Sequence, residues 1–465
     1  MNLKYFKIIF LILSLQMIYI HPAVSQEYPP LPKILPEDRI LIIAPHPDDE
    51  TIAAAGVIQN TLESKSQLRM VWLTNGDSNE YAFLLYKKKP VLKRSAVIKM
   101  GTLRRKEAID AMKVLGVDES QLTFLGYPDF GTMSIFKDFW KSSKSLKSVL
   151  TRVRSVPYYS SPSFGKPYIG DSILEDMIRI LIEFKPTKIF VTLSSDLNSD
   201  HQAAFLFLQV AVWEIKDLIG EPEIYSYLVH SARWPKPKGY HPELAFEPPK
   251  RFSTSSIQWY TLKLNPEQIE KKREAILKYK SQRYKPGYLL AFARSNELFG
   301  QYPDIKLYDK EESLDWNSVE KEMNIESQIY DEDYPGSNTI EEVLYAKTAD
   351  SLYVKIKSPT YKSRLFGVNL FLYGYKKDKH FSEMPKLRFH FQRPNKVVIY
   401  DKRHPVMLPD IKYEYKKREI EVRIPLKLLD NPEMILTSVS SWLRGIPQET
   451  TAWRVLEFPS EEDNP

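Results

Sequence analysis

The segment His46-Pro47-Asp48-Asp49-Glu50 places one imidazole and three carboxylates side by side in the chain. Carboxylates held this close together are costly to bury unless a cation neutralises them. Pro47 restricts the turn, so that His46 and Asp49 can converge on one ion while Asp48 points elsewhere. The alternative is a surface turn with an aspartate at the start of a helix, and the segment alone leaves the two interpretations about even.

A second polar segment, Ser194-Ser-Asp-Leu-Asn-Ser-Asp-His201, favours the metal interpretation. Taken alone, His201 is more simply a solvated histidine at a helix start. One histidine from each segment and one carboxylate form the set His46, Asp49 and His201. Three protein ligands and an open position for water are the arrangement of a catalytic zinc site. The chain has no cysteine, so Zn²⁺, or another divalent metal, must be held by His, Asp and Glu.

Both segments follow short apolar runs that are typical of buried parallel strands. Strands are predicted at residues 39–44, 68–74, 122–126, 188–193 and 223–229. Helices are predicted at residues 50–62, 102–115, 172–184 and 200–215, with Gly116 ending the second and Ser172 and Glu175 at capping-box spacing in the third. This alternation predicts an α/β domain over residues 34–305, with a Rossmann-like, mostly parallel sheet and helices on both faces. Ligands bind such sheets at the carboxyl ends of the strands, where both polar segments lie.

The remainder of the chain has a different pattern. Residues 306–335 are polar and acidic and are interpreted as a connector. Between residues 336 and 460, apolar and polar residues alternate, which predicts an antiparallel β-sandwich domain. Trp442 and Trp453 are either a stacking platform for sugars or core side chains. This domain weakly resembles accessory sugar-binding sandwiches, and packing against the first domain is an equal alternative.

The composition indicates a globular chain without a nucleic-acid partner. The 465 residues are 43% hydrophobic and 27% charged, with a net charge of only +7. Basic residues gather at 86–106 and 137–166, after the second and third predicted strands. Together with Trp140, Tyr158, Tyr159 and Tyr168, these stretches are interpreted as a wall over the site that suits an acidic or phosphorylated glycan. The alternative is a solvated basic face.

The first 25 residues have the pattern of a signal peptide. Lys4 and Lys7 precede an apolar run at 8–20, and Ala23-Val24-Ser25 supplies the small residues of a cleavage site after Ser25. The run is shorter than the roughly 20 residues of a membrane helix. We therefore expect a periplasmic or secreted protein with no stable membrane span after cleavage; the sequence does not indicate its oligomeric state.

Six stretches of the first domain resemble, in order, the LmbE-like, PIG-L-type N-deacetylases. They are Ala44-Pro-His-Pro-Asp-Asp-Glu50, Leu73-Thr-Asn-Gly-Asp77, Arg104-Arg-Lys-Glu107 with Leu115-Gly116, Phe124-Leu-Gly-Tyr-Pro-Asp129, Asp196–His201 and Tyr279-Lys-Ser-Gln282. The resemblance implies a metal-dependent hydrolase that removes N-acetyl groups from an N-acetylglucosamine-type sugar or glycan. It implies that His46, Asp49 and His201 bind the metal and that Asp48 is the general base.

The resemblance also places Arg104 and Asp129 near the substrate sugar. The alternatives are a helix-surface charge for Arg104 and a turn residue for Asp129. Two other functions fit the same metal segment: a non-catalytic glycan-binding protein, and a hydrolase of another amide or an ester.

The chain departs from the family pattern at two positions. Asn198 stands where many members carry a histidine that helps stabilise the tetrahedral intermediate. An asparagine donates a hydrogen bond to an oxyanion but no proton to a leaving group. His230 is a candidate replacement, the alternative being a histidine satisfied at a strand end. Tyr279 stands where a histidine is common and is expected to affect packing more than chemistry.

Overall fold

The computed structural model describes residues 28–78, 93–141, 144–252, 255–282, 286–310, 316, 325–326, 340–358, 366–392, 396–416, 418–444 and 446–459. The predicted signal peptide, residues 1–25, lies outside these ranges. Most of the predicted connector and residues 86–92 of the first basic stretch also lie outside them.

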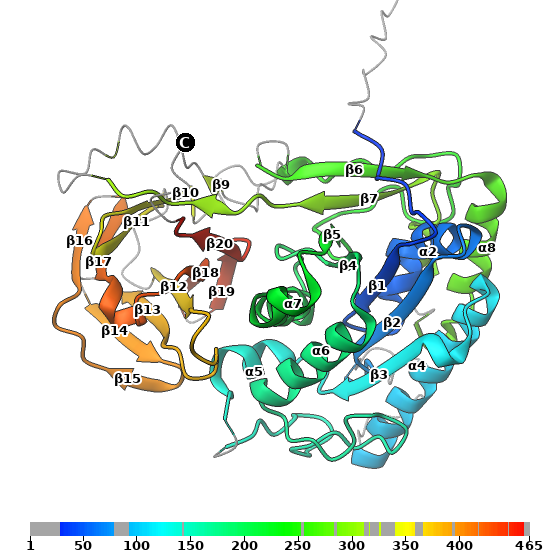
Figure 1. The fold of residues 1–465 in the computed structure, drawn as a ribbon, viewed down its shortest axis with the longest axis horizontal. Coiled ribbons are helices and arrows are strands. Elements are labelled where there is room, and N and C mark those ends of the chain that lie inside the picture. The colour runs from blue at the N-terminus through cyan, green and yellow to red at the C-terminus, as the bar shows by residue number, and fades with distance from the viewer. Residues whose placement is uncertain are drawn as a thin grey trace, which may run out of the picture.

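A seven-stranded sheet, in the order β3-β2-β1-β4-β5-β7-β6, forms the centre of the first domain (Figure 1). Its parallel strands are β1 (Arg39–Ala44), β2 (Gln67–Thr74), β3 (Leu122–Tyr127), β4 (Lys188–Thr192) and β5 (Glu223–Tyr227). Two antiparallel strands, β7 (Asn296–Gln301) and β6 (Gln258–Lys263), extend the sheet beyond β5. The prediction of a mostly parallel sheet is confirmed. The strand order changes direction between β1 and β4, which is where an open α/β sheet forms its ligand crevice.

Helices cover both faces of this sheet because successive residues of its buried strands point to opposite sides. Ile40 and Ile42 of β1 lie in the core beneath α2 (Asp49–Glu63), α4 (Arg94–Leu115) and α8 (Pro266–Ile276). Leu41 and Ile43 lie in the core beneath α5 (Thr132–Asp138), α6 (Gly170–Phe184) and α7 (Ser199–Ile219).

Two predicted helix starts are wrong. Helix α4 starts at Arg94 rather than at residue 102, although it ends, as predicted, at Gly116 in a left-handed conformation with a φ of 92°. Helix α6 starts at Gly170 after the N-cap residue Ile169, so Ser172 lies inside the helix and forms no capping box. A Cβ at Gly170 would lie only 2.5 Å from Trp140 Cε3, so the packing of this indole against the first residue of the helix requires glycine there.

The C-terminal region consists of antiparallel sheets, as the alternating pattern predicts. One sheet has the order β16-β17-β11-β10-β9, and the other has the order β15-β14-β13-β12-β18-β20-β8 with β19 beside β18. Their bounds are β8 (Ile305–Lys306), β9 (Ile325–Glu326), β10 (Glu342–Lys347), β11 (Ser351–Lys357), β12 (Phe366–Tyr375), β13 (Lys386–Gln392), β14 (Lys396–Asp401), β15 (His404–Val406), β16 (Lys412–Lys416), β17 (Glu419–Pro425), β18 (Met434–Leu443), β19 (Ile446–Thr450) and β20 (Arg454–Glu457). Only the short β8–β20 pairing among these strands is parallel. Residues of both sheets, including Val354 and Leu370, share one buried cluster.

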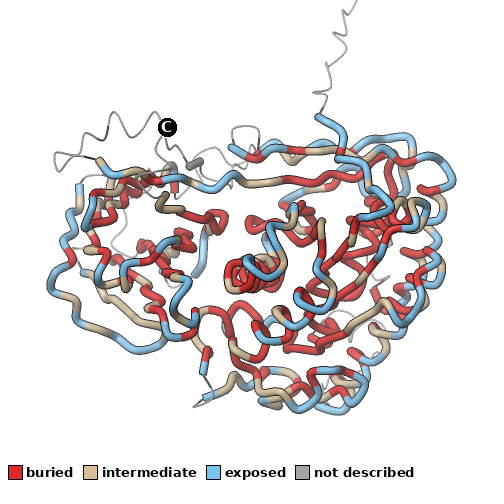
Figure 2. Tube along the Cα trace, in the orientation of Figure 1, coloured by how far each residue is buried: buried red, intermediate tan, exposed pale blue. Residues whose placement is uncertain are grey.

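The two halves of the chain share a second buried cluster. Helix α7 lies between the parallel sheet and the C-terminal sheets (Figure 1), and most of its residues are buried (Figure 2). Trp140, Tyr158 and Tyr168 are at most 5% exposed, so the prediction that they line a glycan wall is wrong. Trp453 is 1% exposed and is a core side chain rather than a sugar platform. Of the four predicted wall aromatics, Tyr159 is the exposed one.

None of the helices in the described ranges combines the length and the apolar character that a membrane span needs.

Candidate metal centre

The two predicted metal segments meet at the carboxyl ends of β1 and β4. His46 follows β1, Asp49 is the first residue of α2, and His201 lies in the first turn of α7. All three side chains are buried, at 6% exposure or less. The strand order brings residues 46 and 201 together because β1 and β4 are direct neighbours in the sheet.

The donor atoms of these three residues are spaced as ligands of one ion would be. His46 Nδ1 lies 3.2 Å and His201 Nε2 3.1 Å from Asp49 Oδ2, and the two nitrogens lie 3.3 Å apart. Tetrahedral ligands with bonds of about 2.0 Å are separated by about 3.3 Å from one another. The observed separations therefore fit a zinc-sized ion, and the set of two nitrogens and one oxygen fits its chemistry.

Each imidazole meets a carboxylate on its other ring nitrogen. His46 Nε2 lies 3.2 Å from Asp129 Oδ1 and 3.4 Å from Asp200 Oδ2. His201 Nδ1 lies 3.3 Å from Asp196 Oδ2. Carboxylates in this position orient metal-binding histidines and raise their basicity. These aspartates also form two alternative ligand sets, one with His46 and one with His201 and His230. Among the three sets, His46, Asp49 and His201 is the one in which two imidazoles each meet a further carboxylate on the other ring nitrogen.

The sequence did not assign roles to Asp196 and Asp200, although both lie in the second polar segment. Asp196 accepts hydrogen bonds from the backbone amides of Asn198, Val229 and His230 at 2.9, 3.0 and 2.8 Å. Asp200 accepts them from the amides of Phe130 and Thr132, at 2.5 and 3.1 Å. Both carboxylates are therefore held by the backbone rather than free to move. Their position in the sequence could have indicated this role, because each lies within five residues of the proposed ligand His201 on the same segment.

Asp48 lies beside the cluster in a strained backbone conformation. Its φ is 125°, a region that non-glycine residues rarely adopt and that tends to occur at functional sites. Burial raises the pKa of Asp48 to about 8, against the opposing effect of Arg104. Arg104 Nη2 lies 3.3 Å from Asp48 Oδ1. Burial thus favours the protonated form of the Asp48 carboxyl group, and the Arg104 guanidinium favours the charged form.

Arg104 is buried and connects two loops of the site. Its guanidinium donates hydrogen bonds to the carbonyl oxygens of Gly76 and Pro47, at 2.8 and 2.7 Å. A Cβ at Gly76, whose φ is +63°, would lie 2.0 Å from Arg104 Nη1, so only glycine fits there. Although Arg104 lines the cavity, its hydrogen bonds go to the protein, and it positions Asp48 directly.

Asp129 and Tyr279 also have defined partners. Asp129 Oδ2 accepts a hydrogen bond from the backbone amide of Ser78 at 2.9 Å, and its Oδ1 faces His46. Asp129 is therefore tied to the cluster as well as lining the cavity. Tyr279 is buried and contacts Glu50 and Thr51 through its hydroxyl group. It packs behind the site, as expected from its place in the sequence.

The carboxylates around His46 and His201 favour the binding of positive charge. Although burial opposes the shift, the carboxylates of Asp129, Asp200 and Asp49 raise the pKa of His46 well above its usual value. Against the same opposing burial, Asp196 and Asp49 raise the pKa of His201 to about 9. Both imidazoles thus bind protons at neutral pH in the absence of a metal. A divalent ion can replace these two positive charges.

Metal binding is expected to release about two protons at pH 7, because His46 and His201 are charged without the ion and must be neutral to bind it. The apparent metal affinity should consequently rise with pH up to about pH 9, the pKa of His201. Calorimetric titration in buffers of different ionisation enthalpy measures the proton count. The His241→Ala variant is the control, since His241 pairs with Glu243 outside the cluster. An affinity that stays constant from pH 6 to 8 would contradict the expected exchange.

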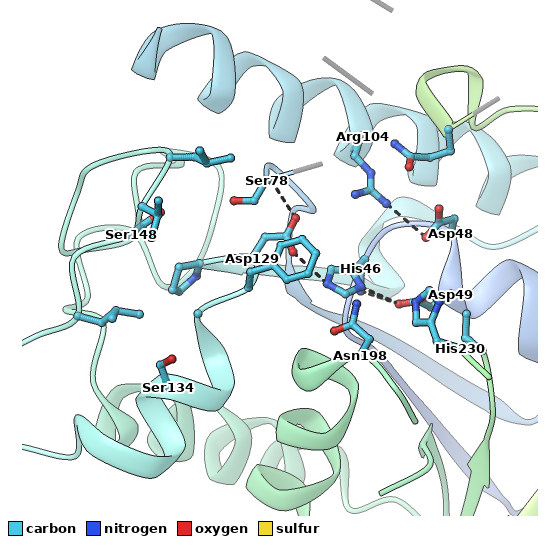
Figure 3. A pocket seen from close by; sticks show the side chains of 18 of the residues that line it. His46, Asp48, Asp49, Ser78, Arg104, Asp129, Ser134, Ser148, Asn198 and His230 are labelled. Carbon is cyan, nitrogen blue, oxygen red and sulfur yellow. Dashed lines mark hydrogen bonds and ion pairs between the residues drawn. The ribbon is translucent and has the colours of Figure 1, made fainter. Parts of the chain in front are cut away.

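The cluster forms one end of a cavity of about 610 Å³ (Figure 3). Ser134 and Ser148 lie on the side opposite His46 and Asp49 in this view. The wall formed by residues 146–150 belongs to the predicted insertion at 137–166, so the described part of that insertion does border the site. Lys147 is its basic member. The cavity is lined by His46, Asp48, Asp49, Ile52, Ser78, Arg104, Pro128, Asp129, Phe130, Gly131, Ser134, Leu146, Lys147, Ser148, Val149, Leu150, Asn198, Val229, His230, Gln282, Tyr288 and Leu289.

Asn198 and His230 both line this cavity. Asn198 is the N-cap of α7, and its Oδ1 accepts a hydrogen bond from the backbone amide of Asp200 at 2.8 Å. The His230 ring lies 4.7 Å from that of His201. Burial lowers the pKa of His230 to about 4, so this imidazole is neutral at pH 7. Seven of the eight predicted site residues line this cavity, and the eighth, His201, lies directly beside His46.

Part of the chain matches a known family. Residues 41–212 match the family model for PIG-L, described as GlcNAc-PI de-N-acetylase. No curated protein matches the chain in sequence.

Several solved structures show a weak similarity. The N,N'-diacetylchitobiose deacetylase from Pyrococcus horikoshii is 17% identical, with a TM-score of 0.36, and the alignment covers 56% of this chain and 82% of that protein. For GalB, the 4-carboxy-2-hydroxymuconate hydratase from Pseudomonas putida KT2440, the identity is 16%, the TM-score 0.37 and the coverages 58% and 98%. The zinc-inhibited form of teicoplanin deacetylase Orf2 is 16% identical, with a TM-score of 0.37. The alignment covers 56% of this chain and 97% of that protein.

The family match extends from β1 into α7 and so includes every residue of the metal cluster. Its boundaries agree with the six sequence stretches, of which only Tyr279-Lys-Ser-Gln282 falls outside it. Residues 41–212 of this chain are a domain of the PIG-L (LmbE-like) family.

Proposed function

We propose that this chain is a metal-dependent hydrolase that removes N-acetyl groups from an N-acetylglucosamine-type sugar or glycan. The family match supports a metal-dependent deacetylase in general. The observation that carries the proposal is the arrangement of His46, Asp49 and His201 at 3.1–3.3 Å, with Asp48 beside them, at one end of a cavity. Zn²⁺ is the metal that we propose for these ligands, which fit another divalent ion as well.

A divalent ion held by His46, Asp49 and His201 would supply Lewis acidity for polarising the amide oxygen and acidifying water. Asp48 takes up the proton of the attacking water and later delivers it to the leaving amine. Arg104 holds the Asp48 carboxylate through the 3.3 Å ion pair and holds its loop through Pro47. Asp196 behind His201, and Asp129 with Asp200 behind His46, keep the two imidazoles in the orientation that would present His46 Nδ1 and His201 Nε2 to the ion.

We infer that Asn198, rather than His230, donates the hydrogen bond to the developing oxyanion. Because Asn198 Oδ1 accepts from the helix backbone, its amide Nδ2 is left to donate into the cavity. Tyr288 Oη donates to the Val229 carbonyl at 2.8 Å, so in its 3.3 Å contact with His230 Nδ1 it accepts. The proton of neutral His230 therefore lies on Nδ1, and its Nε2 is an acceptor that gives an oxyanion no hydrogen bond.

The proposed substrate is an amino-sugar glycan outside the cytoplasm, and an acidic or phosphorylated one is the form we favour. Lys147 at the cavity wall supports an anionic substrate. The composition of residues 1–25 supports export to the periplasm or the medium. A mature N-terminus at Gln26, found by N-terminal sequencing of the exported protein, tests the location. A protein that retains Met1 inside the cells would contradict it.

Acetate release from N-acetylglucosamine oligomers tests the activity. We expect the purified chain to release acetate, to stop after treatment with a chelator, and to resume when Zn²⁺ is added. Glucosamine oligomers without acetyl groups are the control substrate. Metal binding without acetate release from any N-acetylated glycan would instead favour the non-catalytic binding protein. Release that a chelator leaves unchanged would exclude the metal mechanism.

A further inference from the structure

The short helix α5 lies beside the C-terminal sheets (Figure 1), and residues at its beginning line the cavity. On one side, Gly131 and Ser134 line the cavity. On the other side, Phe136 and Trp140 are buried in a cluster that includes residues of β12, β18 and β20. The same seven-residue helix therefore contacts both the proposed active site and the C-terminal region.

The C-terminal region holds α5 through aromatic side chains of β12 and of the loops before β13 and β20. The Phe136 ring lies 6.0 Å from Tyr373, 5.8 Å from Phe381 and 6.4 Å from Trp453. Lys137 Nζ lies 4.3 Å from the centre of the Phe371 ring, a cation–π distance. Contacts on successive residues of the helix limit both its rotation and its translation along the sheet.

The beginning of α5 holds the carboxylate behind His46. Thr132 donates to Asp200 Oδ1 through its backbone amide at 3.1 Å and through its hydroxyl group at 2.5 Å. The amide of Phe130 donates to Asp200 Oδ2, which lies 3.4 Å from His46 Nε2. A continuous set of contacts thus runs from the C-terminal sheet through α5 and Asp200 to His46.

Trp453 also reaches the segment behind the second histidine. Its backbone amide donates to the carbonyl oxygen of Ser194 at 3.3 Å. Ser194 begins the loop that carries Asp196, whose carboxylate faces His201 Nδ1. The C-terminal region therefore contacts the supports of both imidazoles.

We propose that the C-terminal sheets are a positioning element of the metal centre. They hold α5, α5 holds Asp200 through Thr132, and Asp200, together with Asp129, orients the His46 ring. The C-terminal region is accordingly an integral part of the hydrolase and not a detachable sugar-binding module. This inference rests on the proposed function in that it takes His46 as a metal ligand.

Zinc affinity, measured in the full chain by competition with a chromophoric chelator, tests the proposal without depending on activity. Thr132→Val removes the hydroxyl bond to Asp200 and keeps the side-chain volume, and we expect about a 10-fold loss of affinity. Trp453→Ala should also weaken binding, and Trp453→Phe, which keeps a ring against Phe136, should restore most of it. Because both changes act through the supports of the ligands, the double variant should lose less than the product of the two single losses.

Trp442→Ala is the matched control. Trp442 is a half-buried tryptophan of the same sheet, but it stacks on His390 at 4.9 Å and has no place in the cluster around α5. If Trp453→Ala and Trp442→Ala bind zinc like the wild-type chain, the positioning role is wrong while the proposed function stands. If the wild-type chain binds no zinc, the proposed function fails first. If circular dichroism shows that Trp453→Ala does not fold, the zinc affinities of Thr132→Val and Trp453→Phe are the test. Unchanged zinc affinity in Thr132→Val overturns the proposal.

Discussion

Replacement of Asp48 by asparagine is expected to lower kcat about 10²–10⁴-fold, the usual contribution of a general base. Asparagine has the same shape and still offers Arg104 an oxygen, but it cannot accept the proton of the attacking water. Asp48 is not among the three clustered donors, so zinc affinity should stay within about threefold of wild type. Initial rates of acetate release at saturating substrate, with zinc content determined on the same samples, measure both quantities.

The pH dependence of kcat/KM provides a second test of Asp48 as the general base. A base must be deprotonated, so kcat/KM of the wild-type chain should fall as the pH drops through the pKa of Asp48. Burial raises that pKa to about 8, and a bound cation shifts it downward, so the acid limb is expected below pH 8. In Asp48→Asn the residual activity should lack this limb. An identical limb in both enzymes would assign it to another group.

Asp77→Asn is the matched control for Asp48→Asn. Burial raises the pKa of Asp77 to about 7, and its carboxylate accepts a hydrogen bond from Tyr158 at 2.5 Å, but it does not line the cavity. A similar loss of kcat in both variants would point to general disturbance of the buried charges, and Asp48 would then not be the base.

Replacement of His201 by alanine is expected to lower zinc affinity by about 100-fold or more and to abolish acetate release. Changes of residues that merely orient a ligand cost 10–100-fold in metal affinity, so removal of a ligand should cost at least as much. The variant also leaves Asp196 buried without the imidazole that, with His230, holds its pKa at about 2. Zinc competition and acetate release measure the two effects, and Asp196→Asn should show the weaker, orienting effect alone.

His404→Ala serves as the control, because His404 is exposed at the start of β15. It should match the wild-type chain in both assays. Zinc bound at full affinity by His201→Ala would show that the ion uses another of the candidate sets, such as His46, Asp129 and Asp200, and would require a new assignment of the ligands.

Much of the site was predictable because the relevant residues are close in sequence and follow recognisable strands. The apolar runs at 39–44 and 188–193 correspond to β1 and β4, and parallel strands put the segments that follow them at one edge of the sheet. The supports of these residues were not predictable in this way. Thr132 and Asp200 are 68 residues apart, and no local pattern marks their contact.

The insertion at residues 137–166 also had one property that the sequence predicted and one that it did not. Its position at the site followed from the strand that precedes it, and residues 146–150 do line the cavity. Its aromatic residues were expected to face a glycan, yet Trp140 and Tyr168 are buried. Burial of an aromatic ring depends on which surface folds back over it, and for Trp140 that surface includes Phe381, 241 residues away.

The sequence by itself determined the α/β class, the family of residues 41–212 and the two polar segments, and it predicted the His46, Asp49 and His201 set. These features depend on local spacing and on the rule that parallel strands end at a common edge. Only the tertiary structure decided which carboxylate stands behind each imidazole, that Arg104 positions Asp48, and that the C-terminal sheets pack on α5. Those contacts join residues far apart in the chain, and their geometry is set by the packing of two buried clusters rather than by any local pattern.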